Sequence, residues 1–347
     1  MKTVAKTTVL GGKEGTLVTR IRTAVPMDGL LGEHTIRLGI GDDAALIAQK
    51  SGFETVVSSD QFLEGVHFLA KKHPAEVVGF KSLARAVSDL SAMGAEPQAF
   101  LLNLALPQEK TGEWMDGFLL GLRGASRAAG IALAGGDLSR SKTVQISIVV
   151  IGRVRSGYAA RRDGAEPGDL IYVSGRLGLA ALGLRAVLRA IASGGGRRGS
   201  GLAKLIGAHY YPPIRLELGQ WLARNRVATA MMDISDGFST DLYRLCEASG
   251  VGARVEAARL PRPQVDLETR RRLRLSRGAG LESALNGGDD YELLFTVSRN
   301  RAGRLGRVVG GVRVTCVGEI TRKREMTLIN DEGKEVRLAA GGWDPFQ

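Results

Sequence analysis

The sequence is poor in the residues on which thiol and zinc chemistry depend. It contains two cysteines, Cys246 and Cys316, whose separation fits neither a metal-binding nor a redox motif. Cys246 falls on one helical stripe with Leu242 and Leu245, so we expect it in a hydrophobic core. The four histidines show no paired metal-ligand spacing. A disulfide scaffold and a zinc centre are therefore not expected.

Long apolar segments and the common nucleotide-binding signatures are also missing. No run reaches the ~18 apolar residues of a membrane span, and the N-terminus lacks the apolar core of a signal peptide. We therefore expect a cytoplasmic protein without a membrane partner. Neither a G-x-x-x-x-G-K-[ST] loop nor the protein-kinase motif set is present, so any bound phosphates must be neutralised in another way.

The charge balance is strongly positive, at 48 − 36 = +12, whereas aromatic residues make up only 5%. The densest basic run, residues 270–277, contains no aromatic residue, although surfaces that bind single-stranded nucleic acid usually interleave the two. This pattern favours a solvated basic face over a nucleic-acid site. A basic nucleic-acid-binding protein remains the non-enzyme alternative.

The sequence does contain a glycine-rich succession of strands and helices. Its 347 residues are 44% hydrophobic, which is enough for two domain cores. Turn residues interrupt the pattern after residue 154. We therefore predict two domains of mixed α/β (α+β) character, 1–154 and 155–347, and not one doubly wound sheet. Periodicity predicts helices at 14–25, 76–93, 113–129, 177–192 and 238–249, and strands at 44–48, 55–58, 99–106, 131–134, 144–150, 170–174, 228–234, 291–297 and 312–320.

Aspartates recur at turns and at the expected ends of strands. A single such aspartate usually caps a helix or hydrogen-bonds its own backbone. The collective pattern is different, because carboxylates with serine hydroxyls are hard oxygen donors that suit Mg²⁺. Asp89 adds to it, since a carboxylate within a helix that is apolar on most sides needs a partner such as an ion. The other clusters are GIGDD (39–43), SSD (58–60), GGD (135–137), DISDG (233–237) and GGDD (287–290).

At these residues the sequence resembles the thiamine-monophosphate kinases, within the superfamily of aminoimidazole ribonucleotide synthetase and selenophosphate synthetase. The resemblance covers nearly the whole chain, and its motifs are long and follow the family's order. They are GIGDDAAL (39–46), SSDQFLEGVHF (58–68), KSLARAVSDLSAMGAEP (81–97), GGDLSR (135–140), RRDGAEPGDLIYVSG (161–175), DISDGFSTDL (233–242) and GGDDYELLFTV (287–297).

This resemblance implies both an architecture and a reaction. The N-terminal domain, 1–154, would bind metal and ATP and form a homodimer through its β-sheet, and a C-terminal α/β domain, 155–347, would follow. The enzyme would use several Mg²⁺ ions to transfer the γ-phosphate of ATP directly to thiamine monophosphate, which gives thiamine diphosphate. Its partners would be these two substrates and a second copy of the chain, without nucleic acid.

The resemblance also implies roles for individual residues. Asp60 and Asp89 would be catalytic, because they would hold the metal that bridges the reacting phosphates. Substrate contacts would come from His67, Asp289 and Trp343. The implied metal ligands are Asp43, Ser58, Ser59, Asp60, Asp89, Asp137, Asp233 and Asp236, and the implied ATP contacts are Gly136, Asp137, Arg162 and Ser235.

Four positions depart from the family's usual pattern. Ser59 replaces a frequent threonine and keeps the hydroxyl, whereas Gln61 and Val66 stand where threonine and asparagine are common. Asp289 stands where the family commonly has glutamate, so its side chain is one methylene shorter. These departures concern the detail of substrate contact and leave the implied reaction unchanged.

Other members of the superfamily fit less well. A selenophosphate synthetase would carry a reactive cysteine early in the chain, but both cysteines here are late. The related hydrogenase-maturation enzymes end in a cysteine, whereas this chain ends Trp-Asp-Pro-Phe-Gln. An activity like that of aminoimidazole ribonucleotide synthetase is the remaining enzymatic alternative.

Overall fold

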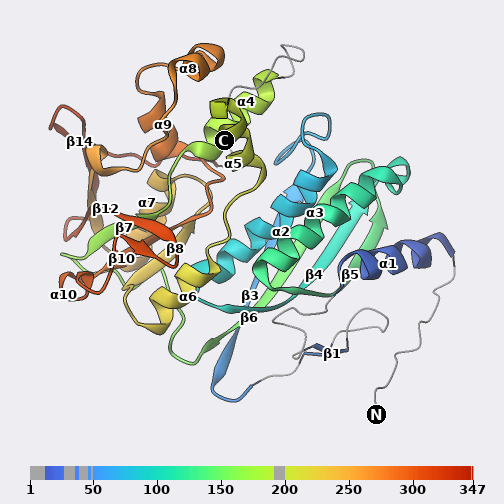
Figure 1. The fold of residues 1–347 in the computed structure, drawn as a ribbon. Coiled ribbons are helices and arrows are strands. Elements are labelled where there is room, and N and C mark those ends of the chain that lie inside the picture. The colour runs from blue at the N-terminus through green and yellow to red at the C-terminus, as the bar shows by residue number, and fades with distance from the viewer. Residues whose placement is uncertain are drawn as a thin grey trace. The chain divides into compact units, whose positions relative to one another are not determined.

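The computed structural model describes residues 12–26, 36–38, 46–47, 50–190, 200–344 and 346 (Figure 1). The chain forms two compact units. The first unit comprises Met1–Ala86 and Pro97–Arg153, and the second comprises Val87–Glu96 and Val154–Gln347. The long helix α2 therefore contributes its C-terminal turns to the second unit. None of the helices in the described ranges is long and apolar enough to cross a membrane.

The first unit is built on a four-stranded sheet. The strand order is β3-β6-β4-β5, and β4 and β5 run parallel. Alternate residues of β6, such as Ile146, Ile148 and Val150, are buried, as expected for a strand with one covered face. The elements are α1 (Gly12–Ala24), β1 (Ile36–Leu38), β2 (Leu46–Ile47), β3 (Phe53–Leu63), α2 (Ala75–Ala92), β4 (Glu96–Leu106), η1 (Gln108–Lys110), α3 (Glu113–Ala129), β5 (Ala132–Arg140) and β6 (Gln145–Arg155).

Helices α2 and α3 lie side by side in the first unit (Figure 1). Two glycines make their close approach possible. A Cβ atom on Gly79 would overlap the Phe118 carbonyl, and one on Gly121 would overlap the Glu76 carbonyl. Any larger residue at either position would push the helices apart, so this contact depends on the absence of a side chain.

The second unit holds a larger sheet of mostly antiparallel strands. Its order is β14-β13-β9-β12-β7-β10-β8, with β11 paired to β12, and only the β13–β9 pairing is parallel among those described. The elements are β7 (Leu170–Ser174), α4 (Leu179–Ala190), α5 (Ser200–Tyr210), α6 (Leu216–Arg224), β8 (Ala230–Ile234), α7 (Phe238–Ser249), β9 (Gly252–Glu256), η2 (Ala257–Arg259), α8 (Leu267–Leu273), α9 (Ala279–Asn286), β10 (Glu292–Val297), α10 (Arg299–Ala302), β11 (Val308–Val309), β12 (Val312–Thr321), β13 (Met326–Ile329) and β14 (Glu335–Arg337).

Hydrophobic cores cover both faces of this larger sheet. On one face, Phe238 and Leu242 of α7 pack against strand residues such as Val173. On the other face, Leu222 of α6 packs with strand residues such as Phe295. Every residue of β8 and β10 is buried, which is the pattern of strands covered on both sides. The sheet therefore gives a rigid base for the loops at the ends of β8 and β10.

Most of the predicted elements are confirmed, with some different boundaries. Helix α3 ends at Gly130, whose φ of 63° is the expected left-handed cap, and β7 has the predicted bounds. Strand β5, in contrast, continues to Arg140, so Asp137 lies inside a strand and not after one. Parallel pairing with β4 extends the strand through the glycines, and at Gly136 the Leu102 backbone comes too close for a side chain to fit. Asp60 likewise lies inside β3.

Candidate functional site

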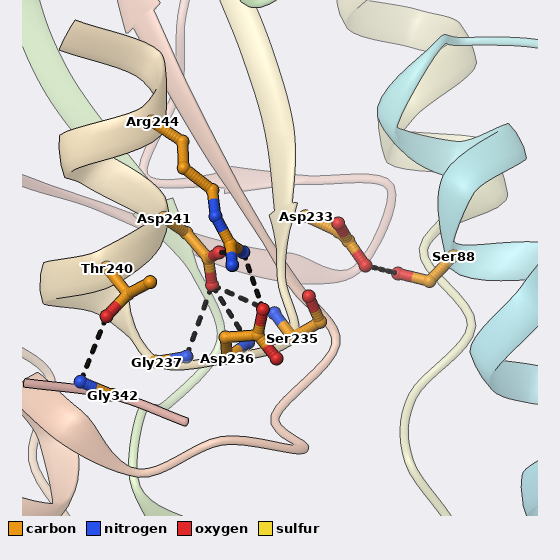
Figure 2. Close-up of polar contacts among 9 residues, drawn as sticks. All are labelled: Ser88, Asp233, Ser235, Asp236, Gly237, Thr240, Asp241, Arg244 and Gly342. Carbon is orange, nitrogen blue, oxygen red and sulfur yellow. Dashed lines mark hydrogen bonds and ion pairs between the residues drawn. The ribbon is translucent and has the colours of Figure 1, made fainter. Parts of the chain in front are cut away.

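In the second unit, Asp233 places a buried carboxylate near the end of β8. Its Oδ2 accepts a hydrogen bond from the Ser88 hydroxyl of α2 at 2.7 Å (Figure 2). Burial, followed by the negative charge of Asp89, raises the pKa of Asp233 to about 7. Asp89 itself is half-buried. Two carboxylates thus lie close enough to repel each other, an arrangement that a cation would relieve.

The turn after Asp233 is held from inside by a second buried carboxylate, Asp241. Its Oδ2 accepts the backbone N–H groups of Ser235, Asp236 and Gly237 at 3.1, 3.0 and 3.2 Å (Figure 2). Asp241 lies in the first turn of α7, where an acidic side chain can satisfy the free N–H groups ahead of the helix. The shape of the turn therefore depends on Asp241.

Arg244 links the two acids of this turn. It donates to Asp236 Oδ2 at 2.5 Å and to Asp241 Oδ1 at 2.8 Å (Figure 2). Burial, followed by the charge of Asp236, raises the pKa of Asp241 to about 6, although Arg244 lowers it. The Arg244 guanidinium is thus shared between two carboxylates. Of these two, Asp241 is buried and Asp236 is half-buried.

The turn of residues 287–291 packs against the turn after β8. The backbone N–H of Asp289 donates to the Ser235 carbonyl at 2.8 Å, and that of Tyr291 donates to the Ile234 carbonyl at 2.8 Å. Asp289 and Tyr291 have φ values of 70° and 49°, which non-glycine residues rarely adopt. Such conformations cost about 1–3 kcal/mol each and persist where the surroundings enforce them.

Asp290 anchors this second turn in the core. Its carboxylate accepts the backbone N–H groups of Gly178 and, at 3.2 Å, of Ala180 at the start of α4. Burial raises the pKa of Asp290 to about 8, even though these two hydrogen bonds lower it. Asp290 therefore fixes the backbone next to Asp289, whose own side chain is 29% exposed.

The side chain of Asp289 also has defined neighbours. The Tyr291 hydroxyl donates to Asp289 Oδ1 at 3.1 Å, and Nδ1 of the buried His209 lies 3.8 Å from Asp289 Oδ2. His209 belongs to α5, and Gly183 of α4 makes room for it, because a Cβ there would meet the His209 Cβ at 2.7 Å. The implied substrate-binding carboxylate is thus oriented by two further residues.

The C-terminal segment crosses the start of α7 and brings Trp343 to the same turn. The N–H of Gly342 donates to the Thr240 hydroxyl at 2.9 Å (Figure 2), and that of Trp343 donates to the Asp236 carbonyl at 2.8 Å. A side chain on Gly342 would overlap the Asp236 carbonyl. The carbonyls of Ser235 and Asp236 therefore hold Asp289 and Trp343, and the Trp343 residue is 50% exposed.

Arg162 of the second unit is exposed, and its carbonyl accepts a hydrogen bond from the Ser249 hydroxyl at 2.9 Å. The Arg162 guanidinium takes no part in the contacts described above between Asp89 and Asp233 or between the two turns. The second unit therefore brings together Asp89 with Asp233, and Ser235 and Asp236 with Asp289 and Trp343.

In the first unit, Ser58 and Asp60 alternate with Ser59 along β3. Ser58 and Asp60 are half-buried and Ser59 is exposed, so the two faces of the strand divide these residues. Both oxygens of Asp60 accept from Arg85 of α2, at 3.1 and 3.2 Å. Asp60, to which the resemblance assigns a metal-binding role, thus forms an ion pair with Arg85 in the structure.

The remaining implied residues of the first unit lie apart from this pair. Gly136 and Asp137 are on β5, at the opposite edge of the sheet from β3, and Asp137 accepts from the Ser139 hydroxyl at 2.8 Å. The His67 ring follows β3; its Nδ1 accepts the Leu63 N–H at 3.0 Å. Asp43 lies outside the described residues, as does most of the glycine- and arginine-rich segment 193–201.

No preformed metal centre is present among the residues that the structure describes, in the sense that no three or more histidine, cysteine or acidic side chains converge. Sequence reasoning missed Asp241, Asp290 and His209. The position of Asp241 in the first helical turn after DISDG was a usable signal. The roles of Asp290 and His209, in contrast, depend on contacts between distant segments. Cys246 is buried in the core as predicted, and burial raises its thiol pKa to about 12.

Two known domain families match consecutive parts of the chain. Residues 41–154 match the AIR synthase related protein N-terminal domain, and residues 166–330 match the corresponding C-terminal domain. The chain is 35% identical to the thiamine-monophosphate kinase of Synechococcus elongatus, over 88% of this chain and 91% of that protein.

Solved structures show the same fold. The thiamine-monophosphate kinase of Stenotrophomonas maltophilia K279a superposes with a TM-score of 0.78 at 35% identity, over 92% of this chain and 96% of that one. The protein AaThiL complexed with AMPPCP and TMP has a TM-score of 0.73 at 27% identity, over 96% of this chain and 97% of that one.

Proposed function

We propose that this chain, which belongs to the AIR synthase related family and within it to the thiamine-monophosphate kinases, phosphorylates thiamine monophosphate with ATP to give thiamine diphosphate. The observation that carries this function is the 35% identity to a thiamine-monophosphate kinase over nearly the whole length of both chains. A related kinase binds an ATP analogue and TMP together, as a kinase with these two substrates should.

We propose Mg²⁺ as the metal, and the donor set of the second unit fits it. Asp233 and Asp89 are hard oxygen donors, and burial, followed by the charge of Asp89, raises the pKa of Asp233. Mg²⁺ usually binds one or two carboxylates and completes its shell with water and substrate phosphates, so a closed cage of protein ligands is not required. Bound Mg²⁺ would neutralise the phosphates and polarise the transferred group.

The remaining assignments extend this proposal to the other implied residues. Asp236 is the further carboxylate of the second unit, and Ser235 a contact for ATP. In the first unit, Asp60 and Asp137 are the carboxylates on β3 and β5, with Ser58 and Ser59 beside Asp60. Metal binding at Asp60 would compete with its ion pair to Arg85, so the arginine would have to release the carboxylate or share it. Asp43, Gly136 and Arg162 keep the roles that the family implies.

At the other end of the substrate, Asp289, Trp343 and His67 are proposed to contact thiamine monophosphate. The thiazolium ring of thiamine is a cation, which suits a carboxylate and the face of an exposed indole. The backbone N–H groups of Asp289 and of the half-exposed Trp343 donate to the neighbouring carbonyls of Ser235 and Asp236, so the second unit offers both side chains from one turn. This geometry supports recognition of the organic part of the substrate there.

We further propose that no protein general base takes part in the reaction. An alcohol must lose a proton to attack, so alcohol kinases place a carboxylate beside it. A phosphate monoester is already mostly a dianion at neutral pH, because its second pKa is ~6. The protein then has to align the two phosphates and neutralise their charge. Free thiamine, which offers a hydroxyl, should therefore not be phosphorylated.

Two further properties belong to this proposal. The enzyme would form a homodimer through the sheet of the first unit. Strand β3 lies at the edge of this sheet, so a strand of the second copy could pair with it. The Val57 side chain of β3, which is 61% exposed, would then be covered by the partner. A cytoplasmic location is also proposed, because ATP is supplied there.

The test is a substrate panel with Mg²⁺, in which thiamine diphosphate is separated by chromatography after incubation with ATP and either thiamine monophosphate or thiamine. We expect product only from the monophosphate. Asp89→Asn and Asp233→Asn should lower kcat by a factor of at least ~10², whereas His67→Ala should mainly raise KM for the monophosphate. Phosphorylation of free thiamine at a comparable rate would refute the base-free mechanism.

A further inference from the structure

The second unit contains a basic groove that none of the assignments above uses. It has a volume of about 490 Å³ and lies between the ends of β7 and β12 and the segment that follows η2. Four arginines line it, Arg176, Arg259, Arg262 and Arg313, and no acidic residue does. We call this feature the arginine groove. Its size is that of a cleft for a small metabolite.

Two of these arginines are already neutralised by acids. Arg259 Nε lies 2.8 Å from Glu256, and Arg262 pairs with Asp331 while it also donates to the Ala257 carbonyl at 2.6 Å. These two arginines therefore help to hold the wall of the groove in place. Their charges are balanced by neighbours and contribute little net attraction for a ligand.

The other two arginines carry the net positive charge of the groove. Within the described ranges of the chain, neither Arg176 nor Arg313 forms a salt bridge, and both side chains are exposed. Arg176 Nη1 donates to the Arg262 carbonyl at 3.3 Å. Two guanidinium groups that face one groove without counter-charges repel each other, and a bound anion would remove this repulsion.

The backbone fixes both arginines relative to each other. The N–H of Gly175 donates to the Arg313 carbonyl at 2.8 Å, and that of Leu177 donates to the Pro261 carbonyl at 3.1 Å. Residues Ser174 and Val314 are paired across β7 and β12. Arg176 and Arg313 are therefore attached to adjacent strand ends that are hydrogen-bonded to each other. Little ordering of the backbone is required when a ligand binds.

Guanidinium groups bind phosphate oxygens through two parallel N–H donors, which makes a phosphorylated compound the matching ligand. The groove has no aromatic side chain, so a nucleobase has no ring on which to stack. We propose that the arginine groove binds the diphosphate or triphosphate group of a small metabolite, at a site separate from the turns of residues 233–237 and 287–291.

The test measures anion binding without divalent metal, since phosphates should not bind to the carboxylates when Mg²⁺ is removed. Inorganic pyrophosphate and tripolyphosphate are titrated calorimetrically into the full-length protein in EDTA. We expect saturable binding that Arg176→Ser/Arg313→Ser weakens by about tenfold or more. The matched control is Arg277→Ser/Arg337→Ser, which removes the same charge from exposed arginines that do not line this groove, and it should bind within twofold of the parent.

Three results would overturn the proposal. These are the absence of saturable binding in the parent protein, equal loss in both double variants, and tight salt-dependent binding of duplex RNA that displaces the phosphates. Kinase activity with Mg²⁺ is measured separately. The groove variant should keep the kcat of the parent, so a failure of the kinase assignment remains distinguishable from a failure of the groove.

Discussion

Asp241 should control the shape of the turn that carries Asp233, Ser235 and Asp236. Replacing it with alanine removes the acceptor of three backbone N–H groups. Gly237 is buried, and a buried N–H without a partner costs about 1–3 kcal/mol. Ser235 and Asp236 are half-buried, so water can recover part of their hydrogen bonding, and each should add about 0.5 kcal/mol. The turn should therefore lose about 2–4 kcal/mol.

The assay is amide hydrogen exchange at the same three N–H groups, because exchange reports the local free energy of opening. A loss of 2–4 kcal/mol corresponds to exchange that is roughly 30- to 1,000-fold faster. Since displacement of a catalytic group by about 1 Å can cost ~10²-fold in rate, kcat/KM should fall by about ten- to a hundredfold. The N–H groups of α7 beyond its first turn should be less affected.

The control is Asp241→Asn, which keeps a side-chain oxygen that can accept the same N–H groups. This variant loses its ion pair with Arg244 but should retain most of the protection of residues 235–237. The reasoning is refuted if Asp241→Ala exchanges these amides at the parent's rate. It is refuted equally if the alanine and asparagine variants lose protection to the same extent, because the backbone contacts would then be irrelevant.

Three further predictions concern the neighbours of this turn. Gly342→Ala should displace Trp343 and raise KM for thiamine monophosphate about tenfold with little change in kcat, and an unchanged KM would contradict the role given to the C-terminal segment. His209→Ala should likewise raise KM through Asp289, whereas His209→Gln should restore part of the loss; equal kinetics in both variants would exclude positioning. Burial raises the pKa of Asp290 to about 8, so its contribution to stability is complete below pH 4 and is lost as the pH rises through about 8. Asp290→Asn should flatten this fall in thermal denaturation between pH 5 and 9, and a profile parallel to the parent's would be inconsistent with it.

The sequence predicted elements with strong local signals more accurately than those set by pairing. Helix α7 begins at Phe238 and ends before Gly250 as predicted, because its apolar stripe and its glycine cap are both local. Strands β3 and β5 are longer than predicted, since their ends are fixed by neighbouring strands. Composition alone could not show that Asp60 and Asp137 would lie within strands.

The sequence shows the clusters of aspartates, but it does not show which contacts each aspartate makes. Asp233 and Asp241 are eight residues apart, and both are buried, yet one faces Ser88 and the other accepts backbone N–H groups. That difference arises from the turn at Gly237, which has a φ of 116°. The ion pair between Asp60 and Arg85 likewise depends on how a strand and a helix meet in three dimensions.

The path of the γ-phosphorus tests the central claim most directly. The protein is incubated with Mg²⁺, thiamine monophosphate and ATP labelled with ³²P at the γ position, and the products are separated. Direct transfer predicts that the label appears in thiamine diphosphate, with one ADP formed for each labelled product. Label that appears only as inorganic phosphate, with thiamine monophosphate unchanged, would contradict the account.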